Sequence, residues 1–376
     1  MPKSKRSTVL VAIAAVFLIA GAAAFAWWWL DGRWYEATDD AYVQGNLVQL
    51  TPQVGGIVVR INADDTALVQ AGDPVVVLDP ADAQTALDGA KASLAQAVRS
   101  VRRLYANTDA LRATVELRRA ELRRAQEDLQ RRTGLPDARA IAQEDLKHAQ
   151  AQVQTAAAAL KAAEQQLAAS EAIVSRTTVA THPQVMQAGA KLRESYLAAH
   201  RTSVLAPVTG YVAKRSVQLG QQVARGAALL AIVPLADVWV DANFKETQLR
   251  HVRIGQPVTL TADLYGSAVT YRGTVTGLAP GTGSAFALLP PQNATGNWIK
   301  IVQRLPVRIR LDPRELAANP LRVGLSMSVS IDTHDRSGAV LAGAPPTRPL
   351  GTTQAYERAP AEAERLELEI IQANLG

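Results

Sequence analysis

Residues Pro52–Leu78 read PQVGGIVVRINADDTALVQAGDPVVVL, and Pro207–Val233 read PVTGYVAKRSVQLGQQVARGAALLAIV. When Gly56 is aligned with Gly210, the copies share two further residues at matching places: Val69 and Gly72 in one, Val223 and Gly226 in the other. Each copy supplies three or four short strands with glycine at the turns, and one hairpin alone is marginally stable in water. The repeat predicts a single β-sandwich whose halves are separated in sequence and joined in space.

The segment between the copies has the seven-residue period of a coiled coil. From Ala81 to Arg132 there is no proline, and the first seam position holds Leu87, Leu94, Val101, Thr108, Val115, Leu122 and Leu129. The residues three places later are mostly apolar, and seven unbroken heptads specify a left-handed coiled coil. An arm of about fifty residues extends about 75 Å.

The sequence TGLPD, Thr133–Asp137, interrupts this pattern with a turn, after which the heptads resume at Leu146, Val153, Leu160, Leu167 and Val174. Two arms joined by so short a loop must fold back antiparallel. We therefore predict a helical hairpin over 81–201 with its tip at about 133–140. A break at THPQ, Thr181–Gln184, divides the returning arm into two helices near the root.

The rest of the chain is mainly β. Strand-like runs between Leu205 and Thr333 predict a small barrel or sandwich. The tail is rich in Ala, Pro, Gly and Thr and ends in one short amphipathic helix of unassigned role. The expected division is anchor 1–36, first barrel strand and first half motif 37–80, hairpin 81–201, second half motif 202–234, β-barrel 235–335, and linker with a short helix 336–376.

The N-terminus carries an uncharged stretch, Ser7–Leu30, after three basic residues. It is long enough to span a bilayer as a helix, and Trp27, Trp28 and Trp29 close it where indole rings favour the membrane interface. A cleaved signal peptide is the alternative reading. We favour an uncleaved, single-pass anchor with a cytoplasmic N-terminus, because the apolar run continues past the possible cleavage sites.

Composition excludes several classes of protein. There is no Cys, which removes disulfides and thiol chemistry. The net charge of +6 is spread in mixed-sign runs without an aromatic-interleaved basic patch, so we expect no nucleic-acid partner. The spacing of Glu144 and His148 could bind metal, but an exposed coiled-coil face explains it better. Lys214 lies in a predicted strand, so we expect no lipoylated or biotinylated lysine, no cofactor and no enzyme activity.

An anchor, two lipoyl-like half motifs around a helical hairpin, and a following β-barrel are together similar to the membrane fusion proteins, or periplasmic adaptors, of the HlyD type. Four phrases carry the resemblance, which covers residues 8–335 and points to the EmrA-type branch: TDDAYVQG (38–45), VWVDANFKETQL (238–249), IGQPVTL (254–260) and GTGSAFALLPPQNATGNWIKIVQRLPVRI (281–309). The resemblance implies a mixed α and β, elongated fold in the bacterial inner membrane, with most of the chain in the periplasm.

The resemblance also implies a contact with an outer-membrane channel at the hairpin tip. Arg131, Leu135 and Ile141 match the family's tip pattern, whereas Ala142 stands where a Ser is expected and Arg132 where an apolar residue is expected. Gly56, Gly72, Gly210 and Gly226 are expected to be structural turn residues of the lipoyl motif.

The expected function is that of an adaptor joining an inner-membrane major facilitator drug transporter to a TolC-like outer-membrane channel. Because one thin hairpin cannot enclose a conduit, we expect a homo-oligomeric ring, a trimer or hexamer. An adaptor of an ABC-type system for polysaccharide or protein secretion is the alternative. An acyl or biotinyl carrier and a purely structural envelope rod are two further alternatives from other classes.

Overall fold

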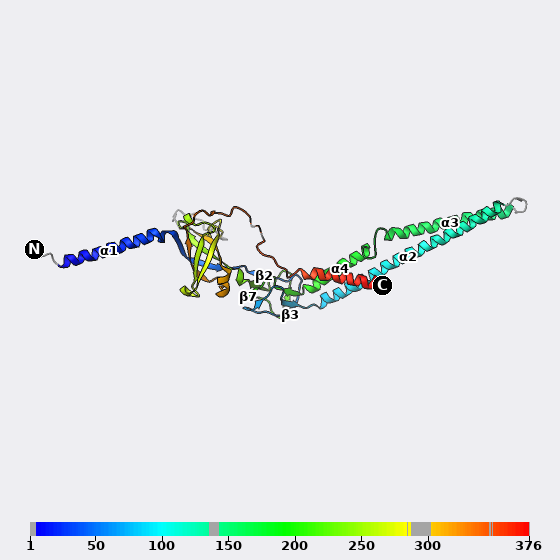
Figure 1. The fold of residues 1–376 in the computed structure, drawn as a ribbon. Coiled ribbons are helices and arrows are strands. Elements are labelled where there is room, and N and C mark those ends of the chain that lie inside the picture. Colours follow the sequence, from blue (N-terminus) through cyan, green and yellow to red (C-terminus); the bar gives the residue numbers. More distant parts are fainter. Residues whose placement is uncertain are drawn as a thin grey trace, which may run out of the picture.

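The parts of the molecule follow one another along a single long axis (Figure 1). The computed structural model describes residues 5–134, 143–283, 285–286, 302–345, 347 and 349–375. A membrane-type helix at one end is followed by a β-barrel, then by a β-sandwich, then by a long helical hairpin. The mixed α and β, elongated fold predicted from the sequence is confirmed.

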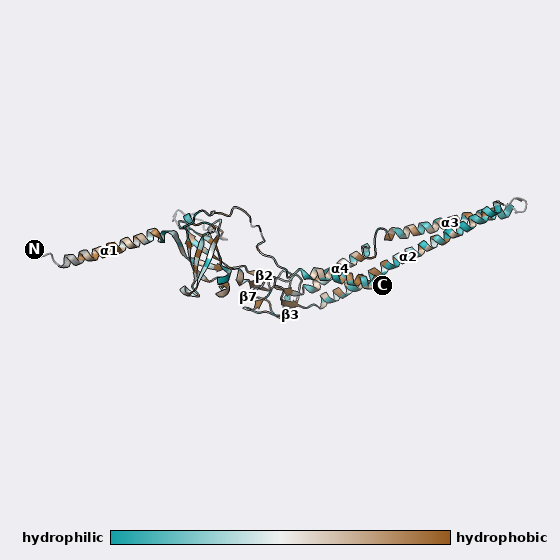
Figure 2. Ribbon diagram, in the orientation of Figure 1, coloured by the Kyte–Doolittle hydropathy of each residue, from teal (hydrophilic) through white to brown (hydrophobic). Residues whose placement is uncertain are grey.

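Helix α1, Lys5–Leu30, is one continuous apolar helix of 26 residues, about 39 Å long. The described side chains of this helix are exposed, and the ribbon in Figure 2 shows that its residues are mostly hydrophobic. Within the described residues, Ala12–Trp34 is the one helical segment long and apolar enough to cross a membrane. A short 3-10 turn, η1 (Gly32–Trp34), connects it to the barrel.

The barrel is closed by six antiparallel strands in the order β1-β10-β13-β12-β11-β14. The strands are β1 (Tyr35–Gln44), β10 (Trp239–Lys245), β11 (Pro257–Ala262), β12 (Thr270–Leu278), β13 (Arg304–Leu311) and β14 (Ser326–Asp332). Strand β1 precedes the rest of the barrel by about 200 residues in sequence, yet it pairs with both β10 and β14. Inward-facing residues such as Phe244, Leu260 and Ile309 are fully buried. The barrel therefore closes only when the chain has returned from the hairpin.

The sandwich consists of two four-stranded sheets, ordered β2-β9-β7-β4 and β6-β5-β3-β8. Its strands are β2 (Val48–Leu50), β3 (Gly56–Ile61), β4 (Leu68–Val69), β5 (Pro74–Leu78), β6 (Ser203–Leu205), β7 (Gly210–Arg215), β8 (Gln222–Val223) and β9 (Leu230–Val233). Each sheet contains strands from both copies of the repeat. Gly56 lies opposite Val223, and Gly210 lies opposite Val69. The shared glycine of each copy thus meets the shared valine of the other.

The four repeated glycines have two different roles. Gly72 and Gly226 lie in turns with φ of +92° and +82°, a conformation that strains any residue with a Cβ. Gly56 and Gly210 are the first residues of β3 and β7, so the expectation that they are turn residues is wrong. A Cβ on Gly210 would lie 2.6 Å from the carbonyl oxygen of Val233. Here glycine permits a close approach of two strands.

The hairpin consists of α2 (Ala81–Thr133) and a returning arm in two pieces, α3 (Gln143–Val174) and α4 (Pro183–His200). Pro183 occupies the first turn of α4, and the side chain of His182 accepts a hydrogen bond from the Gln184 N–H, which caps the helix. The final helix, α6 (Arg358–Leu375), lies beside α2 and α4 (Figure 1). The amphipathic helix expected at the C-terminal end is present, and it packs against the root of the hairpin.

Candidate functional site

The hairpin projects beyond the sandwich as a thin rod (Figure 1). Helix α2 has 53 residues and is about 80 Å long. Its buried residues include Leu87, Leu94, Val101, Thr108 and Val115, five of the seven predicted seam positions, and the remaining two are half-buried. Figure 2 shows the outer half of the rod as predominantly hydrophilic. A narrow apolar seam with polar flanks is typical of a coiled coil in water.

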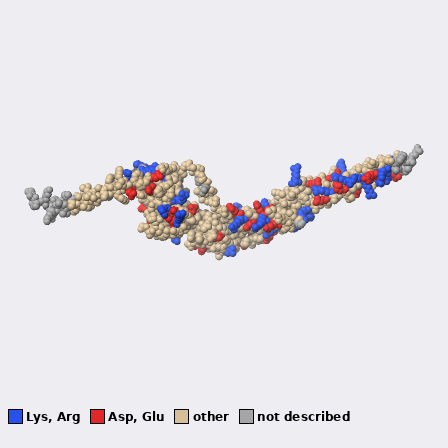
Figure 3. Space-filling view, viewed as in Figure 1, with Lys and Arg blue, Asp and Glu red and all other residues tan. Residues whose placement is uncertain are grey.

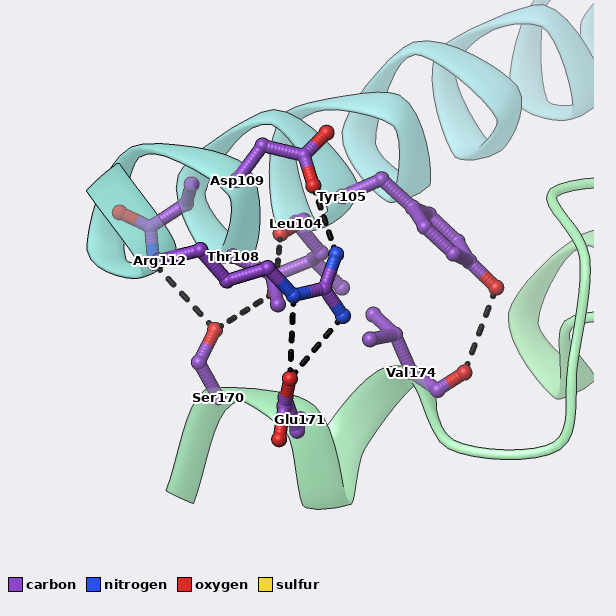
Figure 4. Close-up of polar contacts among 9 residues, drawn as sticks. Leu104, Tyr105, Thr108, Asp109, Arg112, Ser170, Glu171 and Val174 are labelled. Carbon is purple, nitrogen blue, oxygen red and sulfur yellow. Dashed lines mark hydrogen bonds and ion pairs between the residues drawn. The ribbon is translucent and has the colours of Figure 1, made fainter. Parts of the chain in front are cut away.

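One layer of the seam is polar and fixes how the two arms pair (Figure 4). Thr108, 1% exposed, has its hydroxyl 2.8 Å from the hydroxyl of Ser170 on α3, and it also donates to the Leu104 carbonyl at 2.9 Å. A register shift would leave the Thr108 hydroxyl among apolar seam residues without its partner, which costs free energy. A polar residue in a coiled-coil seam therefore selects one register at some expense of stability.

Ion pairs between the arms flank this layer. The Arg112 guanidinium lies 3.0 Å from Glu171 on α3 and 2.8 Å from Asp109 on its own helix. One heptad further out, Arg119 repeats the arrangement with Glu164 at 3.2 Å and Glu116 at 2.8 Å. The Glu171 carboxylate raises the pKa of the Arg112 guanidinium. Because all these side chains are exposed, solvent screens each pair, and the pairs serve mainly to orient the arms.

The tip residues predicted from the sequence divide into two groups. Arg131 and Arg132 end α2, whereas Leu135, Ile141 and Ala142 lie outside the described residues. Both arginines pair with Asp128, at 3.5 Å and 2.9 Å. Arg132 is half-exposed and also donates to the Asp145 carbonyl of the returning arm at 3.4 Å, whereas the Arg131 side chain is 76% exposed. Arg132 therefore connects the arms, and Arg131 presents its charge to solvent.

The break in the returning arm is held by one aromatic side chain. The Tyr105 hydroxyl donates to the Thr177 carbonyl at 2.6 Å, between α3 and α4. It also lies 3.0 Å from the Thr177 hydroxyl. Arg176, in the same break, has a φ of +60°, a left-handed conformation that is unusual for arginine. The chain therefore changes direction at a defined place, anchored to α2.

Helix α6 makes the root of the hairpin a three-helix bundle. Its Ile371 belongs to the buried cluster that includes Leu94, Val98 and Leu192. Polar contacts surround this cluster: Arg193 pairs with Glu367, Tyr196 donates to Glu362 at 2.8 Å, and Arg99 donates to Asn374 at 2.7 Å. The sequence did carry a signal for this packing. One heptad position beside the seam of α2 holds Val98 and Tyr105 near the root, and Arg112 and Arg119 further out. The apolar stripe of α2 is therefore wider near the root than packing against a single helix requires.

The membrane end of the molecule is marked by aromatic rings. The last turn of α1 contains Trp27, Trp28 and Trp29, and each side chain is at least 50% exposed. Rings that are predicted to contact lipid at the membrane interface need this exposure. Trp34 follows in η1, and its ring stacks on that of His334 with the centroids 5.0 Å apart. The first strand of the barrel thus starts directly at the predicted membrane surface.

No cluster of three or more potential metal ligands occurs in the part of the chain that the structure describes. Glu144 and His148 are both exposed on α3. Lys214 lies within β7, and no side-chain ion pair of this lysine is found among the described residues.

Two family models match the chain. The model "EMRA, alpha-helical hairpin domain" matches residues 81–202, and the model "AAEA-like beta-barrel domain" matches residues 237–332. These matches cover the hairpin and the later strands of the barrel, the two regions whose architecture is described above.

Whole-chain relatives agree with these models. The chain is 47% identical to the multidrug export protein EmrA of Escherichia coli K12, over 93% of this chain and 90% of the relative. It is 52% identical to the fatty acid resistance protein FarA of Neisseria gonorrhoeae, over 84% of this chain and 78% of the relative. A solved structure of a periplasmic adaptor protein EmrA has a TM-score of 0.40 at 19% identity, over 80% of this chain and 99% of that one. On the strength of the sequence relatives, the chain belongs to the EmrA family of membrane fusion proteins, the periplasmic adaptors of multidrug efflux pumps.

Proposed function

We propose that the chain joins an inner-membrane transporter of the major facilitator class to a TolC-like outer-membrane channel. The observation that carries this proposal is the distance between two specialised ends. An apolar helix closed by tryptophans lies at one end of the long axis, and the exposed Arg131 lies at the far end of an 80 Å helix. A rod of this length, with one end in a membrane, reaches a partner far from that membrane.

The proposed orientation places the N-terminus in the cytoplasm and the barrel, sandwich and hairpin in the periplasm. Lys3, Lys5 and Arg6 precede the apolar segment, and an excess of basic residues favours the cytoplasmic side. The N-terminal segment acts in this proposal as an uncleaved anchor. The energy for transport comes from the partner transporter.

The proposed assembly is a ring of this chain, a trimer or hexamer. Each hairpin is two helices thick, so a single copy cannot surround a path for a solute, whereas several hairpins side by side can. The relatives are named for multidrug export and for fatty acid resistance. We propose accordingly that the exported compounds are hydrophobic or amphipathic small molecules.

The tip contact is tested by charge reversal at matched positions. Arg131→Glu is compared with Arg124→Glu, because Arg124 is exposed and occupies the same heptad position one repeat earlier. In a strain lacking the chromosomal copy, Arg124→Glu is expected to restore drug resistance to the wild-type level. Arg131→Glu is expected to leave the inhibitory concentration about fivefold lower, the effect of losing roughly 1 kcal/mol of interface energy. Leu135→Asp is expected to act in the same direction.

Full resistance with both Arg131→Glu and Leu135→Asp would contradict the tip contact. Cross-linking from residue 131 identifies the partner directly, and an outer-membrane channel is expected. Co-purification of the chain with an ATPase transporter, in place of a major facilitator transporter, would instead support the alternative role in an ABC-type secretion system.

A further inference from the structure

Four arginines gather at the barrel rim that faces α1. Arg33 lies in η1, Arg250 and Arg253 lie around the turn η3 (Leu249–His251), and Arg336 follows β14. The same rim is joined by hydrogen bonds: the Thr333 N–H donates to the Trp34 carbonyl at 2.8 Å, and the Gln256 amide donates to the carbonyl of Asp335 at 2.7 Å. Figure 3 shows Lys and Arg atoms where the uncharged helix meets the barrel.

Two of these guanidinium groups are held by aromatic rings. Arg33 lies 4.5 Å from the centroid of Trp29 and 4.7 Å from that of Trp34, and Arg336 lies 4.7 Å from Trp34. A guanidinium stacked on a ring uses its face for the contact. Its edge keeps planar N–H donors that match two oxygens of a phosphate. The rings therefore orient the cations through the guanidinium faces, and of the edge donors the Arg336 Nε–H is already used, because it donates to the Thr333 carbonyl at 3.2 Å.

These arginines have no carboxylate partner within ion-pair distance among the described residues. Three acidic side chains of the rim bind elsewhere: Asp332 contacts His334 at 2.6 Å, Asp335 accepts from Ser337, and Asp40 pairs with Arg304 at 2.5 Å. Asp31 makes no ion pair with Arg33. The connection 279–303, which leaves and re-enters the barrel at this rim, contains no Asp or Glu in its sequence. The positive charge of these four arginines is therefore not balanced by an ion pair among the described residues.

The electrostatic field at the rim is positive. Partial burial lowers the pKa of the His251 imidazole, and the neighbouring Arg336, Arg250 and Arg253 lower it further. Arg33 is also at the depth of the Trp29 ring, the level at which indoles meet lipid headgroups. Basic residues within a Debye length of a membrane attract its anionic lipids.

We propose that Arg33 and Arg336, with Arg250 and Arg253 behind them, bind the phosphate headgroup of an anionic phospholipid in the leaflet next to the barrel. The site goes beyond the adaptor function and rests only on the proposed insertion of α1 in a membrane. A bound headgroup would tie the barrel to the bilayer and fix its height above the transporter.

The test is native mass spectrometry of the full chain in detergent, titrated with equimolar phosphatidylglycerol and phosphatidylcholine that carry the same acyl chains. The wild-type chain is expected to retain phosphatidylglycerol in several-fold excess. Arg33→Gln combined with Arg336→Gln is expected to lower this ratio at least about fivefold, the effect of a single basic residue near an anionic surface. Circular dichroism checks that the variants are folded.

The matched control combines Arg225→Gln on the sandwich with Arg310→Gln on the outer face of the barrel, which removes the same charge from exposed positions elsewhere. Equal retention of the two lipids by the wild-type chain, or an equal fall of the ratio in the control, would overturn the proposal. An unchanged ratio of the two lipids in the Arg33→Gln, Arg336→Gln variant would also overturn the proposal. If that variant also loses drug resistance, the rim binds a protein partner instead of a lipid. A reversed orientation of α1 in the membrane would contradict the proposed function. It would not change the lipid ratio, because that ratio is measured in detergent, so the two proposals can fail separately.

Discussion

At the scale of single residues, equivalent places in the two copies of the repeat tolerate change to different degrees. A Cβ on Gly56 would meet the Leu78 Cβ at 3.3 Å, a side-chain contact that can relax by a few tenths of an ångström. A Cβ on Gly210 would meet the Val233 carbonyl oxygen at 2.6 Å and its carbon at 2.8 Å. Backbone atoms of a paired strand cannot move away without breaking the β7–β9 ladder.

We therefore expect Gly210→Ala to destabilise the sandwich by about 1–3 kcal/mol, the usual range for overpacking, and Gly56→Ala to cost less than about 1 kcal/mol. Urea unfolding of the two variants measures the difference. Equal losses would mean that the two halves relax alike, contrary to the contacts described here.

His251 makes the barrel sensitive to acid. Its folded-state pKa is lowered by partial burial and by Arg336, Arg250 and Arg253, so the unfolded chain binds a proton more readily than the folded chain does. Stability from this residue is present above the ordinary histidine pKa, about 6.5, and is lost as the pH falls through the lowered value. His251→Gln is expected to reduce the fall in the barrel's thermal midpoint between pH 7 and pH 5. His148→Gln, on the exposed face of α3, is the control and should leave that fall unchanged.

At the scale of elements, one glycine of α4 lies directly beneath a side chain of α6. The Glu367 side chain lies over Gly189, where it pairs with Arg193, and a Cβ on Gly189 would overlap its carboxylate and lie 2.6 Å from its Cδ. Glycine inside a helix is otherwise unfavourable by about 0.5–1 kcal/mol relative to alanine. Its presence at this position is explained by the close approach of α6.

Because the contacting atoms are the far end of a flexible side chain, Gly189→Ala is expected to push the Glu367 carboxylate away from Arg193 while Ile371 stays packed in the core. Hydrogen exchange of residues 358–375 should therefore become faster by a small factor, about twofold to fivefold. Gly89→Ala on α2 is the control: nothing lies within 4 Å of its Cβ position. That substitution should stabilise the hairpin slightly and leave α6 protected. Unchanged exchange in Gly189→Ala would show that the pair of Glu367 with Arg193 adds nothing to the docking.

Some elements of the fold could be predicted from local sequence patterns, and others could not. The two arms of the hairpin and the break near Thr181 followed from heptad spacing and Pro, which act locally. The interleaved sheets did not follow, because a repeat shows that two halves pair and leaves open which strands exchange partners. The docking of α6 could be predicted only from the wider apolar stripe that Val98 and Tyr105 give to α2. That signal lies more than 250 residues before α6 in the sequence. At the tip, the sequence predicts one role for both Arg131 and Arg132. The structure distinguishes them, because Arg131 is exposed and Arg132 donates to the Asp145 carbonyl of the other arm.

At the scale of the whole molecule, the rod has a length that is set by whole heptads. Removing one heptad from α2 and the facing heptad from α3 shortens the hairpin by about 10 Å and keeps the seam continuous. We expect such a chain to retain its helical content and to lose resistance, because the tip would no longer reach a channel at a fixed height.

Circular dichroism and drug susceptibility test these two expectations. The control removes the heptad from α2 alone, which misaligns Thr108 with Ser170 and should lower the helical content as well. Full resistance in the shortened chain with both heptads removed would contradict a fixed spacing between the inner and outer partners.

The exchange of strands between the two halves of the sandwich also has a consequence for biogenesis. During export the first half emerges more than 120 residues before the strands that complete both of its sheets. The hairpin between them forms through contacts that are mostly along one helix or between adjacent arms, and such contacts form early. When the arms zip together they bring residues 80 and 202 side by side, which reduces the loop-closure entropy that the sandwich must overcome. The helical arm would thus first serve as the chain's own folding scaffold.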